Sequence, residues 1–298
     1  MADTTISKLN VKHAPDMRSR GLWSDAFRRL LRHRLGMVGA LILVVTVILA
    51  LFGPSLIPYD TSAMDFNARF APPTVQHIFG TDDFGRDTFS RVALGARVSL
   101  QVGVISVGLA ATVGTLLGML AGYGNRLLDE LIMRSMDVLY AFPAILLAIA
   151  IMAALGKGVG NAMIAIGVVY IPIFARIARG SVLSVRNEEF VQAAHALGAG
   201  HGRILFRHIF PNILSPIIVE TSLSLAFAIL AEAALSFFGL GTQPPDPSWG
   251  RMLSEGRGYF RQSVWMGIFP GLAIMVTVMA FNFLGDGLRD ALDPRLRR

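Results

Sequence analysis

Six long stretches of the chain are almost wholly apolar, and polar segments separate them. They cover residues 36–57, 98–122, 138–156, 158–175, 213–239 and 262–285. Each holds about 18 or more residues. A helix that rises about 1.5 Å per residue needs about 20 residues to cross the ~30 Å apolar core of a bilayer. The pattern predicts an all-α membrane protein with six transmembrane helices.

The polar segments divide the chain into five parts. We predict a cytoplasmic tail over 1–35, a first transmembrane helix over 36–57, an extracytoplasmic loop over 58–96, a core of five transmembrane helices over 97–287, and a second cytoplasmic tail over 288–298. In the first tail, Trp23, Phe27 and Leu30 recur at helical spacing among arginines. This favours a helix lying on the inner leaflet, with a solvated basic tail as the alternative.

Composition and charge agree with a membrane protein of defined orientation. Of the 298 residues 53% are hydrophobic and 16% charged, whereas soluble domains carry about 25% charged residues. The two tails and the segments after the second and fourth apolar stretches hold 19 of the 27 Lys and Arg residues. The positive-inside rule therefore predicts that both termini are cytoplasmic. This bias and attraction to anionic lipid explain the net charge of +7 better than a nucleic-acid partner does.

Two local patterns predict packing. Gly114, Gly118 and Gly122 are spaced by four, which allows close approach of two helices in lipid. Residues 243–249 contain three prolines and end at Trp249, so we predict a rigid outer segment whose tryptophan lies at the headgroup level or against protein.

Two acidic clusters suggest metal binding at first sight. Asp82, Asp83 and Asp87 lack the ligand spacing of a calcium loop, and Arg86 and Arg91 compete for the carboxylates, so we predict a packed surface element. The second cluster is Asp286, Asp290 and Asp293, where nearby arginines favour an ion-paired helix end. The chain has no Cys, which excludes structural disulfides and thiolate metal sites.

A polar, helix-forming segment lies between the fourth and fifth apolar stretches and must sit in water at the membrane face. Asn187 is predicted to cap a helix that stops at Gly198, and a second short helix over about 202–210 is predicted to end at Pro211. This arrangement resembles a DNA-binding helix-turn-helix, but a segment held against a bilayer is poorly placed to bind DNA. We interpret it as a docking surface.

The spacing in this segment resembles the EAA loop of binding-protein-dependent ABC importer permeases. That loop reads Glu-Ala-Ala, three residues, Gly, nine residues, then Ile-x-Leu-Pro. Here the positions are Gln192-Ala193-Ala194, Gly198 and His208-Ile209-Phe210-Pro211. Gln, His and Phe replace the Glu, Ile and Leu of the motif. The stretches 80–91, 235–241, 243–250 and 285–295 are also similar to the permease subunit (C-type) of the dipeptide/oligopeptide/nickel branch.

The resemblance implies a type I ABC importer permease fold in the bacterial cytoplasmic (inner) membrane. It implies a second, homologous permease, two cytoplasmic ATPase subunits and an extracytoplasmic solute-binding protein as partners. The coupling loop would be 187–211, and its ATPase-coupling residues would be Glu189, Gln192, Ala193, Ala194, Gly198, Arg203, Arg207 and Pro211. The solute would be hydrophilic, with a di- or oligopeptide favoured over nickel, glutathione or another small solute.

The chain has no G-x-x-x-x-G-K-[ST] phosphate-binding loop. We therefore expect it to be a transport subunit and no enzyme, with no cofactor of its own, while ATP and Mg are bound by the partner ATPases. The six His are scattered, and no catalytic triad or metal cluster is apparent in the sequence.

Three polar residues inside the apolar stretches are candidates for the translocation path. Glu220 and Glu232 are costly within a span, so each should face a cavity or a partner group. For Glu220 two roles remain open: it lines the translocation path, or it makes a hydrogen bond that holds helices together. For Glu232 the structural role is favoured. Asn282 is a weaker candidate.

Two other classes of protein fit part of the pattern. A proton-coupled secondary transporter could use Glu220 as its proton carrier, but no internal inverted repeat is visible and the docking segment would lack a purpose. A membrane-anchored receptor or scaffold would leave six spans and two intramembrane carboxylates unexplained.

Overall fold

The computed structural model describes residues 28–56 and 59–292, and the regular elements in them are helical. The α-helices are α2 (Arg34–Leu56), α3 (Thr88–Tyr123), α4 (Arg126–Tyr140), α5 (Ala144–Leu155), α6 (Val159–Val185), α7 (Glu189–Ala196), α8 (His201–Arg203), α9 (Phe210–Phe237), α10 (Trp249–Arg257) and α11 (Trp265–Leu292). A 3-10 helix, η1 (Phe66–Ala68), lies in the loop after α2, and a π-helix, η2 (Ile204–Ile209), joins α8 to α9.

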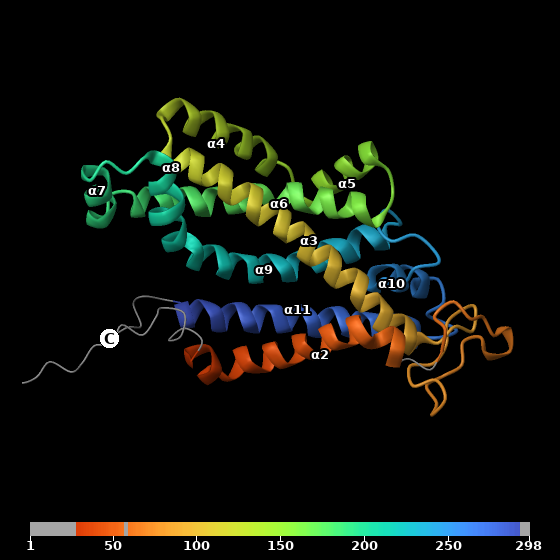
Figure 1. Cartoon of the computed structure of the whole chain (residues 1–298). Helices are drawn as coiled ribbons and strands as arrows, with labels where there is room; N and C mark the ends of the chain where they lie inside the picture. The colour runs from red at the N-terminus through yellow and green to blue at the C-terminus, as the bar shows by residue number, and fades with distance from the viewer. Residues whose placement is uncertain (1–27, 57–58, 293–298) are drawn as a thin grey trace, which may run out of the picture.

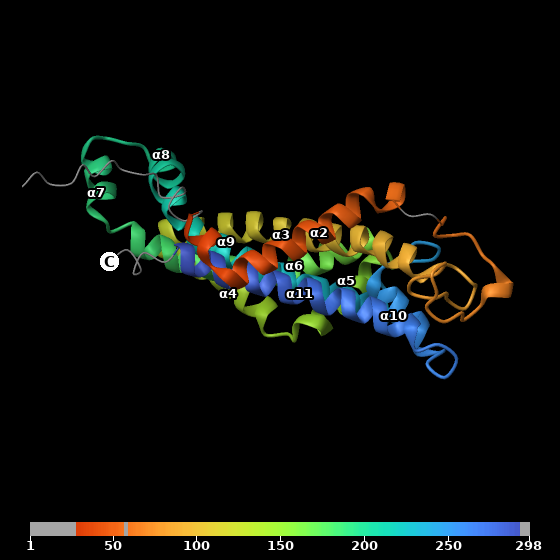
Figure 2. The same ribbon diagram turned by 90° about the horizontal axis from the view of Figure 1, so that it is seen from below.

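The long helices lie side by side in an elongated bundle (Figure 1). The start of α2 and the end of α11 lie at the same end of the bundle as α7 and α8. The segment 59–87 and α10 lie at the opposite end, and the view turned by 90° shows the same separation (Figure 2). The order of the helices therefore brings both ends of the described chain to one face.

The prediction of an all-α protein with six spans is confirmed, with a correction to the third span. Over residues 28–56 and 59–292, five helices are long and apolar enough to cross a membrane: α2, α3, α6, the run from α8 through α9, and α11. The stretch 138–156 was predicted as one helix, but α4 and α5 form a pair bent by 93°, which makes a sixth span if counted as one. Pro143 precedes α5 and disfavours helical backbone at the residue before it, so the helix breaks there.

The second span begins earlier than its apolar pattern. α3 starts at Thr88, so the outer loop predicted over 58–96 ends at Asp87. The Asp87 carboxylate accepts a hydrogen bond from the Ser90 backbone N–H at 2.8 Å and caps the helix. Arg91 is buried in the second turn, where Asp82 and Glu255 pair with it. The helix therefore starts in a charged region in which Arg91 is ion-paired with two carboxylates.

The fourth and sixth helices continue beyond their apolar stretches. α6 runs to Val185 because Arg176 and Arg179, which follow the apolar residues, pair with carboxylates of α4. α11 runs to Leu292, so the tail predicted over 288–298 is partly helical. In the acidic cluster of this helix end, Asp290 lies 3.3 Å from His33, and Asp293 falls outside the described residues.

The start of the chain is described only in part. Residues 28–32 are helical, whereas Trp23 and Phe27 of the predicted interfacial helix lie outside the described residues. The helix is interrupted at His33, whose Nδ1 accepts a hydrogen bond from the Gly36 N–H at 2.9 Å at the start of α2. The ring thereby satisfies one of the free N–H groups of the first turn.

The close approach predicted from the glycine spacing is confirmed between α3 and α6. A Cβ on Gly114 would lie 2.6 Å from the Ile171 carbonyl oxygen, and one on Gly122 would lie 2.9 Å from the Val182 Cβ. A Cβ on Gly118 would collide with the Ala175 carbonyl oxygen. The two backbones touch along three turns, which fixes α6 against α3.

The outer acidic cluster is a packed, ion-paired element, as predicted. Arg86 Nε lies 2.6 Å from Asp82 Oδ2, and Arg91 Nε lies 3.4 Å from the same oxygen. Glu255 of α10 lies 3.1 Å from Arg91, which ties α10 to the start of α3. Among the described residues, no group of three or more His, Asp or Glu side chains could hold a metal ion.

The two neighbouring aspartates of this cluster should respond oppositely to neutralisation. Asp82→Asn should cost about 3–5 kcal/mol because it leaves the buried Arg86 and Arg91 without their shared carboxylate. Burial, followed by the neighbouring Asp82, raises the pKa of Asp83. The folded protein therefore holds the Asp83 proton more tightly than the unfolded chain does, so the ionised carboxylate lowers stability at neutral pH.

We expect Asp83→Asn to be neutral or stabilising at pH 7, and the difference from wild type to shrink as pH falls through the raised pKa of Asp83. Thermal unfolding of the purified protein at pH 7 and pH 4.5 measures both variants. Equal destabilisation by the two changes at pH 7 would show that the carboxylates are interchangeable.

Candidate functional site

The docking segment is a helix-turn-helix at the end of the bundle that holds both described ends of the chain (Figure 1). α7 ends at a turn in which Gly198 has a φ of 79°. The Gly198 N–H donates to the His195 carbonyl and the Ala199 N–H donates to the Ala194 carbonyl, at 2.9 and 3.0 Å. This pattern closes a helix with a left-handed residue, which glycine adopts without strain. The helix stop predicted at Gly198 is confirmed.

The start of α7 differs from the prediction. Glu188, and not Asn187, is the cap residue, and its side chain makes no capping hydrogen bond. The Asn187 amide donates instead to the Leu183 carbonyl at the end of α6, at 3.4 Å. Gln192 donates its own amide to the Asn187 carbonyl at 3.0 Å. A glutamate at position 192 could not donate this bond, so the glutamine suits this loop.

Pro211 does not end the second helix. The chain passes from α8 through η2 into α9 as one run, and the Phe210 N–H donates to the Leu205 carbonyl five residues back. A π-turn widens the helix, which accommodates the missing N–H and the ring of the following proline. The second arm of the docking segment is therefore continuous with the fifth span.

All but one of the predicted coupling residues are exposed. The exposed members are Glu189, Gln192, Ala193, Gly198, Arg203, Arg207 and Pro211. Ala194 is buried and belongs with Val191, Ile204 and Ile209 to the hydrophobic core that holds the two arms together. Only Ala193 of the alanine pair is available to a partner.

Two features of this surface were missed from the sequence. Leu197 is 88% exposed beside the glycine turn, and Phe206 is 58% exposed on the second arm. Both side chains are accessible to a partner, and the position of Leu197 directly before Gly198 could have indicated its exposure. Tyr123, at the end of α3, also lies within hydrogen-bond distance of His195 and His201. No local pattern predicts that contact.

The surroundings of Glu232 agree with the structural role that the sequence favoured, and that role stays a prediction. Glu232 is 1% exposed. Ser99 of α3 donates to one carboxylate oxygen at 3.1 Å, and Ser236 donates to the other at 2.7 Å. A buried carboxylate needs such partners, and here they join α3 to α9.

Glu220 and Asn282 remain predictions as path residues. Glu220 is half-buried on α9, where the Ser224 hydroxyl donates to it at 3.0 Å. It lies within electrostatic range of the Tyr170 hydroxyl on α6. Asn282 is half-buried on α11. Glu220 thus retains one polar partner and partial access to its surroundings.

A pair of substitutions at Glu220 distinguishes its two possible roles. Glu220→Gln keeps the size and an acceptor for Ser224, so we expect normal assembly but a changed transport rate or a changed preference for solute charge. The measurement is uptake of cationic, neutral and anionic solutes by the assembled transporter. If Glu220→Gln transports normally while Glu220→Leu fails to assemble, the residue is structural and Asn282 becomes the next candidate.

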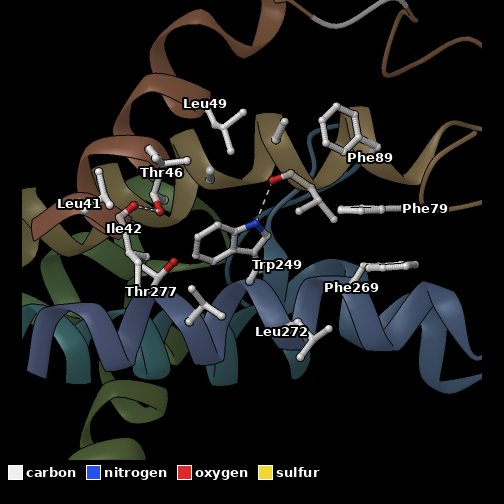
Figure 3. Close-up of a pocket in the computed structure, with 16 residues that line it drawn as sticks. Leu41, Ile42, Thr46, Leu49, Phe79, Phe89, Trp249, Phe269, Leu272 and Thr277 are labelled. Atoms are coloured by element: carbon white, nitrogen blue, oxygen red, sulfur yellow. Dashed lines mark hydrogen bonds between the residues drawn. The ribbon is translucent and has the colours of Figure 1, made fainter. Parts of the chain in front are cut away.

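An apolar cavity of about 580 Å³ lies among α2, α3, α10 and α11 (Figure 3). Trp249 is buried beside it and donates from Nε1 to the Val92 carbonyl at 2.9 Å. The predicted protein contact of this tryptophan is thereby confirmed. The walls are almost wholly apolar, with Phe79, Phe89 and Phe269 at one end. A hydrophilic solute would lose its water there without compensation, so this cavity is no route for one.

The fold is a helical bundle with several helices apolar enough to cross a membrane and an exposed helix-turn-helix at one end. Residues 114–298 match the sequence profile described as binding-protein-dependent transport system inner membrane component. Residues 21–73 match the N-terminal transmembrane domain of oligopeptide transport permease C. The chain belongs to this family of permeases and is a multi-pass protein of the bacterial cytoplasmic membrane. The family consists of ABC importer permeases and not of enzymes.

Relatives of known name cover almost the whole chain. A dipeptide transport system permease protein of Alkalihalophilus pseudofirmus is 49% identical over 275 residues, which are 92% of this chain and 90% of the relative. A glutathione transport system permease protein of Escherichia coli is 46% identical over 276 residues, or 92% of this chain and 91% of the relative.

The fold is also found in a solved ABC transporter. The MetNI methionine transporter, in an inward-facing conformation, aligns with a TM-score of 0.57 and 17% sequence identity. The alignment covers 68% of this chain and 96% of that chain. The type I ABC importer permease fold that was expected from the EAA-like spacing is confirmed.

Proposed function

We propose that this chain forms half of the transport pathway of a peptide importer. A second, homologous permease supplies the other half, and an extracytoplasmic binding protein delivers the solute. The named relatives, a dipeptide and a glutathione permease at 49% and 46% identity, support a di- or oligopeptide as the solute. Glutathione is itself a peptide, so both names describe one chemical class.

The observation that carries the proposal is the exposed helix-turn-helix at one end of an otherwise apolar bundle. Its second arm is continuous with α9, so a force applied at Arg203 or Arg207 reaches the fifth span directly. The exposed Leu197 and Phe206 give a partner two apolar anchors. We propose that two cytoplasmic ATPase subunits dock here and that they alone bind ATP and Mg, since this sequence lacks a phosphate-binding loop.

The proposal fixes the orientation of the chain. The end with α7 and α8 faces the cytoplasm together with both termini, in agreement with the positive-inside rule. The outer segment 59–87 and α10 then face the binding protein. Their buried ion pairs, from Arg86 and Arg91 to Glu255, make this end a rigid platform.

Uptake by the reconstituted complex tests the substrate. The complete transporter, with its binding protein, is placed in proteoliposomes and supplied with radiolabelled trialanine, glutathione or nickel. We expect uptake of trialanine, with unlabelled peptides of other sequence as competitors. Uptake of glutathione alone would select the alternative peptide solute, and uptake of nickel alone would contradict the peptide assignment.

A further inference from the structure

A groove between α4 and α6 is lined by charged side chains that the apolar stretches gave no reason to expect. Its lining residues are Arg126, Asp129, Glu130, Met133, Arg134 and Asp137 of α4, with Arg176 and Arg179 of α6. They surround a cavity of about 490 Å³. Arg179 makes two hydrogen bonds to Asp129, at 2.5 and 2.7 Å, and Arg176 makes one to Asp137 at 2.8 Å. The guanidinium of Arg176 also lies 4.1 Å from the centre of the Tyr140 ring.

The groove begins at the end of the bundle that carries α7, where α4 and α6 extend beyond the apolar stretches 138–156 and 158–175, and it ends at the boundary of these stretches, at Asp137 and Arg176. At about 1.5 Å per residue, Arg179 lies roughly 9 Å and Arg176 roughly 14 Å from the end of α6 at Val185. The side chains of Arg176 and Asp137 are 39% and 58% exposed, so the chain itself does not cover them. Charged side chains that are left exposed at the boundary of the apolar stretches face water or a polar partner and avoid lipid.

The break between α4 and α5 lies beside the deep end of this groove. Residues 141–143 are exposed and leave the helical path, and the two helices meet at 93°. Non-helical backbone at membrane depth is tolerated only within protein or along a water-filled cavity. Because these residues are not buried within the chain, water or a partner covers them. The break and the charges therefore point to the same environment.

The other exposed side of α4 has a different character. Leu127, Leu131 and Val138 are 77%, 66% and 62% exposed and follow one another at helical spacing. They form an apolar stripe that suits lipid or an apolar protein surface. The exposed charged side chains of α4 thus lie on the face toward the groove, and the exposed apolar side chains lie on another face of the helix. A uniformly solvated helix would show no such division.

We propose that the α4–α6 groove lines the cytoplasmic half of the transport pathway and is the charged surface that a zwitterionic solute meets before release. The assignment of a peptide to this surface rests on the proposed function. Each arginine–carboxylate pair offers both signs of charge. The ammonium end of a peptide replaces Arg176 as the partner of Asp137, while the carboxylate end of the peptide pairs with Arg176. No charge is left without a partner during the exchange, which keeps its cost low.

Tyr170 is a single polar group on a cavity that is otherwise almost wholly apolar, farther along α6 from this end of the bundle. Tyr170 lies roughly 22 Å from the end of α6, beside a cavity of about 230 Å³ formed with residues of α5 and α9. Glu220 lies within electrostatic range of its hydroxyl.

Cysteine accessibility tests whether the groove is aqueous. The chain has no native Cys, so single cysteines can be labelled without background from it. Met133→Cys lies in the groove, and Leu131→Cys lies two residues away on the apolar stripe at nearly the same depth. The assembled transporter in inside-out vesicles is treated with a membrane-impermeant methanethiosulfonate. Since the thiolate is the reactive form, we expect Met133→Cys to react about tenfold faster or more.

Equal, slow labelling of both cysteines by this reagent would overturn the proposal, even if peptide uptake is normal. Rapid labelling of Met133→Cys without any peptide uptake would sustain an aqueous groove and reject the peptide assignment. The labelling and uptake results together therefore distinguish a failure of the aqueous-groove proposal from a failure of the proposed peptide transport.

The solute contact has its own test in proteoliposomes. Arg176→Gln should lower uptake of trialanine by about tenfold or more, the effect of one charge-assisted hydrogen bond, and should leave uptake of trialanine amide unchanged. The double variant Arg176→Gln with Asp137→Asn keeps a neutral hydrogen-bonded pair and controls for assembly. An equal loss for both peptides in an assembled double variant would show that the pair is structural and would contradict the contact.

Discussion

Gly198→Asp should leave the transporter assembled in the membrane but reduce uptake by about tenfold or more, the change that ~1.4 kcal/mol of lost interaction produces. Gly198 is exposed with a φ of 79°, and a Cβ there would meet no atom within 4 Å. The substitution therefore causes no clash. It disfavours the left-handed turn and places a carboxylate on the surface proposed to dock the ATPase.

Two neighbouring variants separate these effects. Gly200→Asp adds the same charge two residues away, where φ is −67° and no left-handed backbone is needed. Gly198→Asn carries no charge and tolerates the left-handed conformation better than most residues. We expect ATP hydrolysis to persist in all three, with uptake lost most in Gly198→Asp and least in Gly198→Asn. Normal uptake by Gly198→Asp would remove Gly198 from the docking surface.

Gly118→Val should destabilise the permease by roughly 1–3 kcal/mol or prevent its assembly, as overpacking of a tight interface does. The added Cβ would lie 2.7 Å from the Ala178 Cβ and closer still to the Ala175 carbonyl oxygen, so α6 would have to move away from α3. Displacement of α6 would also disturb the Arg176 and Arg179 pairs with α4.

Gly108→Val is the matched control on the same helix. Nothing lies within 4 Å of a Cβ at Gly108, and its backbone is helical like that of Gly118. We expect a change within about 0.5 kcal/mol. Thermal unfolding of the purified protein in detergent measures both variants. Equal melting temperatures for the two would show that α3 and α6 are not locked by small residues.

The sequence predicted those features that depend on local chemistry. The six apolar stretches predicted the transmembrane helices because the length and hydropathy of a segment decide whether it can span a bilayer. The left-handed turn at Gly198 was predictable because it depends only on the glycine itself and on the helix that ends there. Pro143 can kink a helix or mark its entry, but a division into two helices was not predicted because the residues on either side are apolar and continue the hydropathy pattern.

Features that depend on distant partners could not be predicted. Glu232 is paired with Ser99, 133 residues earlier in the chain, so its structural role required the packing of α3 against α9. α6 extends through Arg176 only because Asp137 lies opposite on α4. Ala194 is buried rather than exposed because the second arm folds over it, which the EAA-like spacing does not show.

The central claim is that this permease imports a solute with energy from partner ATPases. The direct measurement is uptake of radiolabelled trialanine by the complete complex in proteoliposomes whose proton gradient and ATP supply are set independently. The account predicts that uptake survives collapse of the gradient by an ionophore and stops when ATP is withheld. Uptake that follows an imposed proton gradient without ATP, and that Glu220→Gln abolishes, would contradict it and would identify a proton-coupled transporter.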